Sequence, residues 1–237
     1  MVFFMFASAC YQLRVTIKTQ HLAFFQLFTF EFINMKIIAI GRNYYEHAQE
    51  LSNPIPEKPV VFLKPDTALL RDNKDFYFPG FSSEIHHEIE LVLRISKEGR
   101  HISEKFASNY YDAIGLGIDF TARDIQTQHK QKGLPWELAK AFDHAAPISN
   151  FVDKTMFSNI YDLNFSLYKN GHMVQKGNTS QVIFSFEMII SYVSTFITLR
   201  KGDIIYTGTP AGVGPIAIGD HLEAYLEDTK MLDFNIK

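Results

Sequence analysis

Residues 86–91, HHEIEL, place two carboxylates, Glu88 and Glu90, at alternate positions of a short apolar run. Side chains alternate between the two faces of a β-strand, so both carboxylates lie on one face, and Ile89 and Leu91 lie on the other. Like charges on one strand face repel each other, most strongly where the site is partly buried. A hard divalent cation, which takes oxygen ligands, would remove this repulsion. A solvated strand face beside Lys or Arg is the simpler interpretation, and the spacing alone favours it.

A metal site of this kind needs a further carboxylate from elsewhere in the chain. Asp119 ends the apolar run YYDAIGLGIDF (residues 110–120), where an acidic side chain has no packing role. Three carboxylates without a thiolate or a clear histidine cluster favour Mg²⁺ or Mn²⁺ over Zn²⁺. Asp119 is therefore the best candidate for a third ligand.

A histidine and a carboxylate occur together in GRNYYEHAQEL (residues 41–51). His47 and Glu50 are three positions apart, which brings them together on one face of a helical turn. A carboxylate beside an imidazole orients the ring and raises its basicity, as a base that activates water requires. Taken alone, the two residues are more simply explained as a surface pair on an exposed helix.

Two further segments carry groups suited to binding an anion. DFTARDIQTQHKQKGLPWELAK (residues 119–140) contains Arg123, Gln126 and Lys140, which could hold a carboxylate substrate beside a metal or lie on solvated helix faces. YTGTPAGVG (residues 206–214) could let backbone N–H groups and hydroxyls approach an anion, and a plain tight loop explains it equally well. It matches neither a Walker nor a Rossmann fingerprint.

The composition restricts the class of protein. A net charge of −3 and a pI near 6.3 leave no basic surplus, so neither a nucleic-acid nor an anionic-membrane partner is expected. A single cysteine, Cys10, excludes a disulfide framework and indicates a reducing compartment, which we take to be the cytoplasm. No apolar run reaches the roughly 18 residues of a membrane span.

The first 34 residues differ from the rest, with three charged residues and eight of the 22 phenylalanines. The segment lacks the basic region that begins a signal peptide. We expect residues 1–34 to be an atypical N-terminal extension, either untranslated sequence upstream of Met35 or a dispensable tail, with a signal or anchor as the alternative. Residues 35–237 then form one catalytic domain.

Short β-branched and aromatic runs bounded by turn residues predict most of the regular structure. Strands are expected at residues 36–41, 60–64, 88–95, 110–120, 203–208, 221–226 and 231–236. Asn170-Gly171, between two alternating runs, predicts a β-hairpin. Many strands with few helices indicate an α+β fold that is mainly β.

Two helices are predicted. The first covers residues 121–132, with Thr121 and Asp124 as a capping box at its start and Gly133 at its end. The second follows a Ser185 cap, and its apolar residues recur at helical spacing and are expected to face the core: Phe186, Ile189, Ile190, Val193 and Phe196.

Six motifs in this order resemble the fumarylacetoacetate hydrolase family, and most closely its small acylpyruvase and oxaloacetate decarboxylase branch: GRNYYEHAQEL, VVFLKP, HHEIEL, IDFTARDIQ, KGLPWELAK and ITLRKGDIIYTGTPAGVGP. The resemblance runs from about Met35 to the C-terminus. It implies a mixed β-sheet roll with a few helices, a homodimer, and a Mg²⁺ or Mn²⁺ ion.

The resemblance also implies a role for each matching residue. The metal ligands fall on Glu88, Glu90 and Asp119, and the pair that activates water falls on His47 and Glu50. The active-site lysine falls on Lys140. Positions that line the substrate pocket fall on Arg42, Arg123, Gln126 and Thr209.

The implied function is that of a divalent-metal-dependent enzyme that acts on small 2-oxo acids through a metal-stabilised enolate. It would hydrolyse the C–C bond of an acylpyruvate, decarboxylate oxaloacetate, or do both. The alternative is an isomerase or tautomerase of 2-hydroxy-dienoate or oxaloacetate-type substrates. A two-metal phosphoesterase would need a denser set of Asp and His ligands. The combination of acid, base and lysine argues against a non-catalytic metal-binding module.

Overall fold

The computed structural model describes residues 35–50 and 55–237. The expected extension, residues 1–34, lies outside the described residues. A six-stranded sheet has the order β2-β1-β12-β5-β6-β9, and a four-stranded sheet has the order β11-β10-β14-β15. A three-stranded sheet, β13-β4-β7, and the pair β3-β8 complete the strands of the described residues. The α+β, mainly β prediction is confirmed.

The six-stranded sheet is built from the apolar runs that predicted strands. Its members are β1 (Ile37–Gly41), β2 (Val60–Lys64), β5 (Ile89–Ile95), β6 (Tyr111–Ile118), β9 (Val152–Asp153) and β12 (Ile204–Tyr206). The sheet is mixed, because β1 pairs in parallel with β12 while β5 pairs antiparallel with both β12 and β6. Its central strands are almost fully buried, which is why apolar residues occupy most of their positions on both faces.

The four-stranded sheet begins with the predicted hairpin. Its strands are β10 (Asn164–Lys169), β11 (His172–Asn178), β14 (His221–Leu226) and β15 (Thr229–Asn235). Asn170 and Gly171 both have positive φ, +54° and +77°, as a two-residue hairpin turn requires. The remaining strands are short: β3 (Leu69–Leu70), β4 (Ile85–His87), β7 (Thr121–Ala122), β8 (Ala146–Pro147) and β13 (Gly214–Pro215).

The helices are α2 (Tyr45–Glu50), α3 (Glu104–Ala107), α4 (Arg123–Lys132), α5 (Glu137–Lys140) and α6 (Phe186–Phe196). As predicted, Ser185 caps α6 by accepting a hydrogen bond from the Met188 N–H, and Gly133 ends α4 in the left-handed conformation. Short 3-10 turns occupy Asp66–Ala68, Ser108–Tyr110, Lys154–Met156 and Thr179–Gln181.

Two details of the helix predictions are wrong. Thr121 does not cap α4; it lies in β7, and its hydroxyl donates to the Asp119 carbonyl. The Asp124 carboxylate accepts hydrogen bonds from Ser82 and Ser83 rather than completing a capping box. In α6, the apolar stripe is buried except at its end, where Phe196 is 64% exposed.

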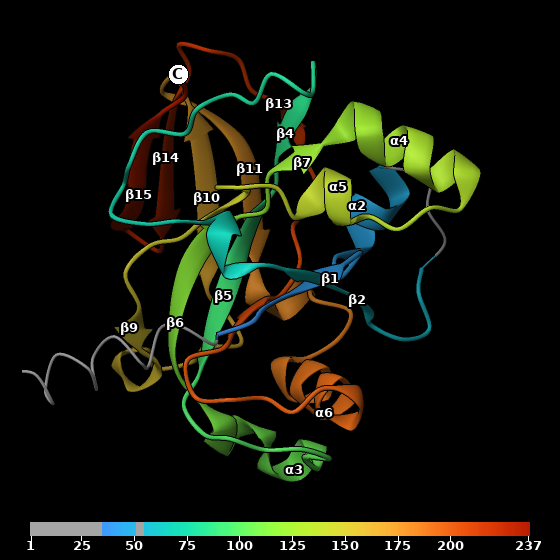
Figure 1. The fold of residues 1–237 in the computed structure, drawn as a ribbon. Helices are drawn as coiled ribbons and strands as arrows, with labels where there is room; N and C mark the ends of the chain where they lie inside the picture. The colour runs from blue at the N-terminus through green and yellow to red at the C-terminus, as the bar shows by residue number, and fades with distance from the viewer. Residues whose placement is uncertain (1–34, 51–54) are drawn as a thin grey trace, which may run out of the picture. The chain divides into compact units, whose positions relative to one another are not determined.

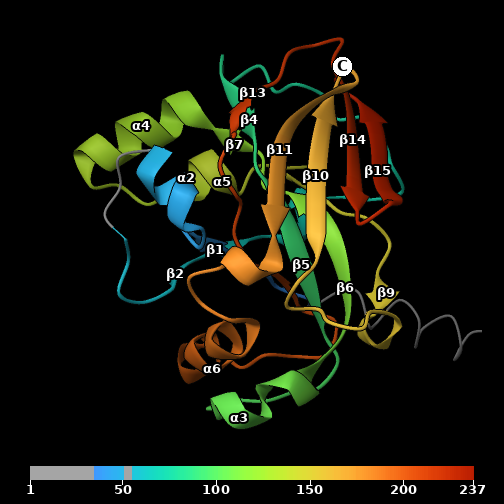
Figure 2. The ribbon, with the colours of Figure 1, turned by 180° about the vertical axis from the view of Figure 1, so that it is seen from behind.

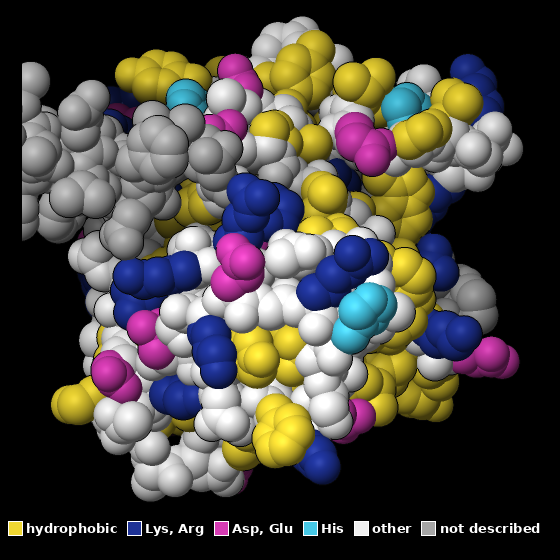
Figure 3. Space-filling view, turned by 60° about the horizontal axis from the view of Figure 1, so that its bottom comes forward, with side chains coloured by type: hydrophobic (Ala, Val, Ile, Leu, Met, Phe, Trp, Pro, Cys, Tyr) yellow, Lys and Arg dark blue, Asp and Glu magenta, His cyan; other side chains and the backbone are white. Residues whose placement is uncertain are grey.

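The helices lie at two ends of the sheets. Figures 1 and 2 show α2, α4 and α5 together beside β4 and β7, whereas α3 and α6 lie at the opposite end. The face brought forward in Figure 3 carries basic and acidic side chains interspersed. No helix among the described residues has both the length and the apolar character needed to cross a membrane.

Candidate active site

The three predicted carboxylates meet at one end of β5 and β6. Glu88 lies between β4 and β5, Glu90 lies within β5, and Asp119 directly follows β6. The antiparallel register pairs Ile89 with Ile118, and the Asp119 N–H donates to the Glu88 carbonyl over 2.8 Å. All three side chains are buried, and one oxygen atom from each lies within 4.8 Å of the other two. The strand pairing therefore brings the third carboxylate to the E-x-E motif.

Glu88 and Asp119 lie against three basic side chains, of which Lys64 and Lys140 are buried and Arg123 is partly exposed. Lys140 Nζ lies 2.7 Å from an oxygen of each carboxylate, Lys64 Nζ lies 2.7 Å from Asp119 Oδ1, and Arg123 lies 2.6 Å from Glu88 Oε1. Burial raises the pKa of Glu88, but Lys140 and Arg123 outweigh it and hold that pKa below its usual range. Burial opposes the charge on Lys140, but Asp119 and Glu88 raise its pKa overall. Glu88 and Lys140 are therefore both charged at neutral pH.

Glu90 is the exception among the three carboxylates. No described Lys or Arg side chain forms an ion pair with it, and its Oε2 accepts a hydrogen bond of 2.6 Å from the Gly208 N–H. Burial, followed by the charges of Asp119 and Glu88, raises its pKa well above the usual value. Gly208 has a φ of +107°, and a Cβ atom there would lie 2.5 Å from the Cβ of Asn43, so this donor position requires glycine.

This donor set fits a hard divalent cation. It offers only carboxylate oxygens, which Mg²⁺ and Mn²⁺ favour, in a buried place with room for all three to contribute. Glu90 has no described cationic partner, and it would supply negative charge once a bound cation offsets the burial and neighbouring charges that raise its pKa. Lys140 would share Glu88 and Asp119 with that cation.

His47 and Glu50 are brought together on α2, as their spacing predicts. His47 is 4% exposed, and its Nδ1 lies 3.4 Å from Glu50 Oε2. The Gly212 N–H also donates to the Glu50 carboxylate, with the nitrogen 3.2 Å from both oxygens. Burial lowers the pKa of His47, against the charges of Glu88 and Glu50, which raise it. His47 is therefore a neutral base at neutral pH, and a proton on Nδ1 donated to Glu50 leaves Nε2 free to accept one.

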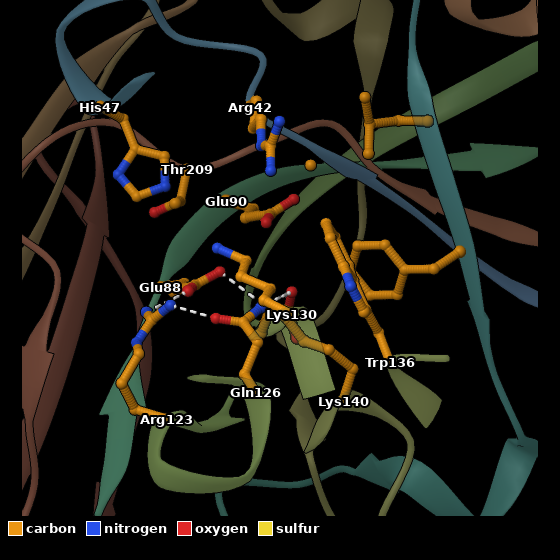
Figure 4. A pocket seen from close by; sticks show the side chains of 14 residues that line it. Arg42, His47, Glu88, Glu90, Arg123, Gln126, Lys130, Trp136, Lys140 and Thr209 are labelled. Carbon is orange, nitrogen blue, oxygen red and sulfur yellow. Dashed lines mark hydrogen bonds and ion pairs between the residues drawn. The ribbon is translucent and has the colours of Figure 1, made fainter. Parts of the chain in front are cut away.

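One pocket collects almost every predicted site residue (Figure 4). Nine of the ten line it, and the tenth, Glu50, contacts His47; the nine are Arg42, His47, Glu88, Glu90, Asp119, Arg123, Gln126, Lys140 and Thr209. His47 and Thr209 lie to one side of Glu90 in this view, and Trp136 lies to the other. Arg123 donates to Gln126 Oε1 over 2.6 Å as well as to Glu88, so these side chains are held in one orientation.

The sequence interpretation missed several residues of this site. Lys64 ends β2 in VVFLK and is fully buried against Asp119, where it also donates to two backbone carbonyls. Lys130 and Trp136 line the pocket without belonging to a predicted set. A lysine that ends an apolar strand is the one signal that could have drawn attention to Lys64, because a charged residue there has no packing role.

Gln175 is a further missed residue, and it comes from the other sheet. It is 2% exposed on β11, and its Oε1 accepts from the Ile89 N–H and from His87 Nδ1. Its amide nitrogen donates to Thr209 Oγ1 and to the Pro210 carbonyl. One amide thus joins the strand beside Glu88 to the loop that carries Thr209.

Replacing Gln175 by Leu leaves the Ile89 N–H and the His87 Nδ1–H buried without acceptors. Since each unsatisfied buried group costs about 1–3 kcal/mol, we expect the free energy of unfolding to fall by about 3 kcal/mol. Mn²⁺ affinity should fall as well, because Gln175 holds His87 and Ile89, the residues on either side of Glu88. Chemical denaturation and calorimetry measure the two quantities. Gln181→Leu, at an exposed position, is the control, and equal behaviour of the two variants would contradict this role for Gln175.

Comparisons with known proteins find relatives in sequence and in structure. Residues 36–237 match the family described as "Fumarylacetoacetate (FAA) hydrolase C-terminal". The chain is 43% identical over 201 residues to the mitochondrial oxaloacetate tautomerase of Mus musculus, which covers 85% of this chain and 91% of that protein. It is 44% identical over 185 residues to the mitochondrial oxaloacetate decarboxylase of Dictyostelium discoideum, which covers 78% of this chain and 85% of that protein.

Solved structures with this fold are also similar in sequence. A fumarylacetoacetate hydrolase family protein from Yersinia pestis CO92 superposes with a TM-score of 0.83 at 39% identity, covering 85% of this chain and 93% of that one. The fumarylpyruvate hydrolase of Pseudomonas aeruginosa, solved with Mn²⁺ and pyruvate, has a TM-score of 0.81 at 32% identity, covering 85% and 88%.

Proposed function

This chain belongs to the fumarylacetoacetate hydrolase family, and from that premise we propose that it is a divalent-metal-dependent enzyme of 2-oxo acids. We propose that it cleaves the C–C bond beyond the 2-oxo group, by hydrolysis of an acylpyruvate or by decarboxylation of oxaloacetate. The observation that supports this is one pocket in which three buried carboxylates, a neutral histidine and a charged lysine meet.

The charges of the pocket suit an anionic substrate. Lys140 and Arg123 balance the charges of Glu88 and Asp119, while burial lowers the pKa of Lys64 and raises that of Glu90, so an added divalent cation leaves a positive surplus. The cation would supply a Lewis acid for the carboxylate and adjacent carbonyl oxygens of a 2-oxo acid. Arg123, held by Glu88 and Gln126, offers planar N–H donors that orient a carboxylate.

Lys140 is placed to stabilise negative charge. Its Nζ donates to Glu88 and Asp119 over 2.7 Å and to Thr121 Oγ1 over 2.5 Å, which fixes a full positive charge at the floor of the pocket. Cleavage of the bond beyond the 2-oxo carbonyl leaves an enolate. A preorganised ammonium beside that enolate stabilises it without further reorganisation of the site.

His47 is placed to act as the base. Its neutral imidazole lines the same pocket, and Glu50 orients it through Nδ1. In acylpyruvate hydrolysis it would take a proton from the water that attacks the distal acyl carbonyl. Decarboxylation of oxaloacetate reaches the same enolate by loss of CO₂ and needs no attacking water.

Proton transfer alone is the second candidate function. His47 could take a proton from carbon and return it to oxygen, while the positive charge of Lys140 in the same pocket stabilises the enolate between the two steps. The Mus musculus relative is named an oxaloacetate tautomerase, and a structural relative from Mycobacterium marinum is named a 2-hydroxyhepta-2,4-diene-1,7-dioate isomerase. Either reaction would use the residues described here.

A panel of 2-oxo acids tests the proposed function. We expect turnover of acetylpyruvate, measured as released acetate, or of oxaloacetate, measured as released CO₂, with Mg²⁺ or Mn²⁺ and none with EDTA. Loss of enol absorbance without product release would identify the tautomerase instead. Unchanged activity in EDTA would contradict metal dependence, and inactivity towards all three readouts would overturn the proposal.

Two expectations from the sequence stay predictions. One is the homodimer that the family resemblance implies. The other is the cytoplasmic location, since the Mus musculus and Dictyostelium discoideum relatives are mitochondrial by name.

A further inference from the structure

Two cations at the pocket contact the same aromatic ring. The guanidinium carbon of Arg42 lies 5.9 Å from the centroid of the Trp136 ring, and Lys130 Nζ lies 5.7 Å from it. The three residues come from separate segments: Arg42 follows β1, Lys130 belongs to α4, and Trp136 precedes α5. All three line the pocket that holds the acidic triad (Figure 4).

These two cations differ from the others in the site. Lys64, Lys140 and Arg123 each contact a carboxylate, whereas no described Asp or Glu forms an ion pair with Arg42 or Lys130. Burial lowers the pKa of Lys130, and the nearby charges of Arg42 and Arg123 lower it further. Like charges converge here without an anion between them.

The aromatic ring explains how the cations are held in place. Trp136 packs against Phe62 with ring centroids 6.0 Å apart, so the indole is anchored to β2. A cation over an indole is attracted by the ring's quadrupole, which keeps Arg42 and Lys130 over the pocket rather than extended into solvent. Lys130 is nevertheless exposed, which places it at the mouth of the pocket.

We propose that Arg42 and Lys130, positioned by Trp136, bind a second carboxylate at the far end of the substrate, so that the enzyme selects 2-oxo dicarboxylic acids over 2-oxo monocarboxylic acids. This inference rests on the proposed function, because the first carboxylate and the 2-oxo group must occupy the triad end of the pocket. Lys64, Lys140 and Arg123 lie against Glu88 and Asp119 at the triad end, where the first carboxylate would bind, whereas Arg42 and Lys130 form no ion pair with a described Asp or Glu.

A matched pair of unreactive ligands tests the selection. 2-Oxoglutarate and 2-oxopentanoate share five carbons and the 2-oxo acid group, and they differ in a distal carboxylate against a methyl group. Oxalate, which has no distal end, reports on the triad end alone. Calorimetry on the Mn²⁺-loaded protein at low ionic strength should show 2-oxoglutarate binding about tenfold more tightly than 2-oxopentanoate, as a charge-assisted contact predicts.

Lys130→Met keeps the aliphatic stem and removes the charge. We expect this variant to bind 2-oxoglutarate about tenfold more weakly than the parent protein does. Its affinities for oxalate and 2-oxopentanoate should stay within about twofold of those of the parent. Arg42→Gln should reproduce the pattern. Lys132→Met is the matched control, because Lys132 is an exposed lysine of the same helix that does not line the pocket.

The possible outcomes separate this inference from the proposed function. If the parent binds oxalate but does not distinguish 2-oxoglutarate from 2-oxopentanoate, the second-carboxylate site is wrong and the proposed function stands. The second-carboxylate site is also wrong if Lys130→Met weakens the binding of 2-oxoglutarate and 2-oxopentanoate equally, or weakens neither. If the Mn²⁺-loaded parent binds none of the three ligands, the proposed function fails and the inference falls with it.

Discussion

Glu90→Gln is expected to weaken Mn²⁺ binding by at least about 10²-fold and to abolish turnover, without unfolding the protein. The substitution removes the one carboxylate of the triad that forms no ion pair with a described Lys or Arg, and with it the charge that a divalent cation would neutralise. The side-chain amide oxygen can still accept the hydrogen bond from the Gly208 N–H, so the surrounding loop keeps its position.

Calorimetry measures the Mn²⁺ affinity of this variant, and a thermal melt of the same sample shows whether it remains folded. The fold should survive because a buried carboxylate with a raised pKa is replaced by a neutral isostere. Glu98→Gln, at an exposed position, serves as the control and should bind Mn²⁺ like the parent. Parent-like Mn²⁺ binding by Glu90→Gln would mean that Glu90 is not a ligand.

His47→Ala is expected to separate the two cleavage reactions that share this site. It removes the proposed base and leaves the triad and its cations unchanged. Base catalysis is typically worth about 10²–10⁴-fold, so acylpyruvate hydrolysis should fall by that factor. Oxaloacetate decarboxylation should fall less, because it needs no activated water.

Lys140→Ala is the comparison variant, and it should impair both reactions because both pass through an enolate. Both activities are measured on both variants at saturating Mg²⁺, with melting curves to detect loss of folding, since Lys140 is buried against two carboxylates. Equal losses of hydrolysis and decarboxylation in His47→Ala would contradict a base that acts on water.

Local patterns in the sequence determined the pieces of this protein. Alternation placed Glu88 and Glu90 together, a spacing of three brought His47 to Glu50, and Asn170-Gly171 set the hairpin turn. Ser185 and Gly133 marked helix ends because capping needs only neighbouring backbone groups. The capping box predicted at Thr121 was wrong because residues distant from the helix start decide this position. The Thr121 hydroxyl donates to the Asp119 carbonyl and accepts from Lys140 Nζ.

Only the tertiary structure decided which residues surround the triad and how charge is shared among them. Asp119 joins the E-x-E motif through the register of β5 with β6, and Gln175 reaches it from a different sheet. Lys64 ends β2, an edge strand of its sheet, and it became a partner of Asp119 because its side chain is buried in the folded protein. Strand register and burial depend on contacts distant in sequence, and the strength of a charge interaction depends on distance and on exclusion of water. For this reason the spacing of residues showed which carboxylates could bind a metal, whereas the fold left Glu90 without a described cationic partner.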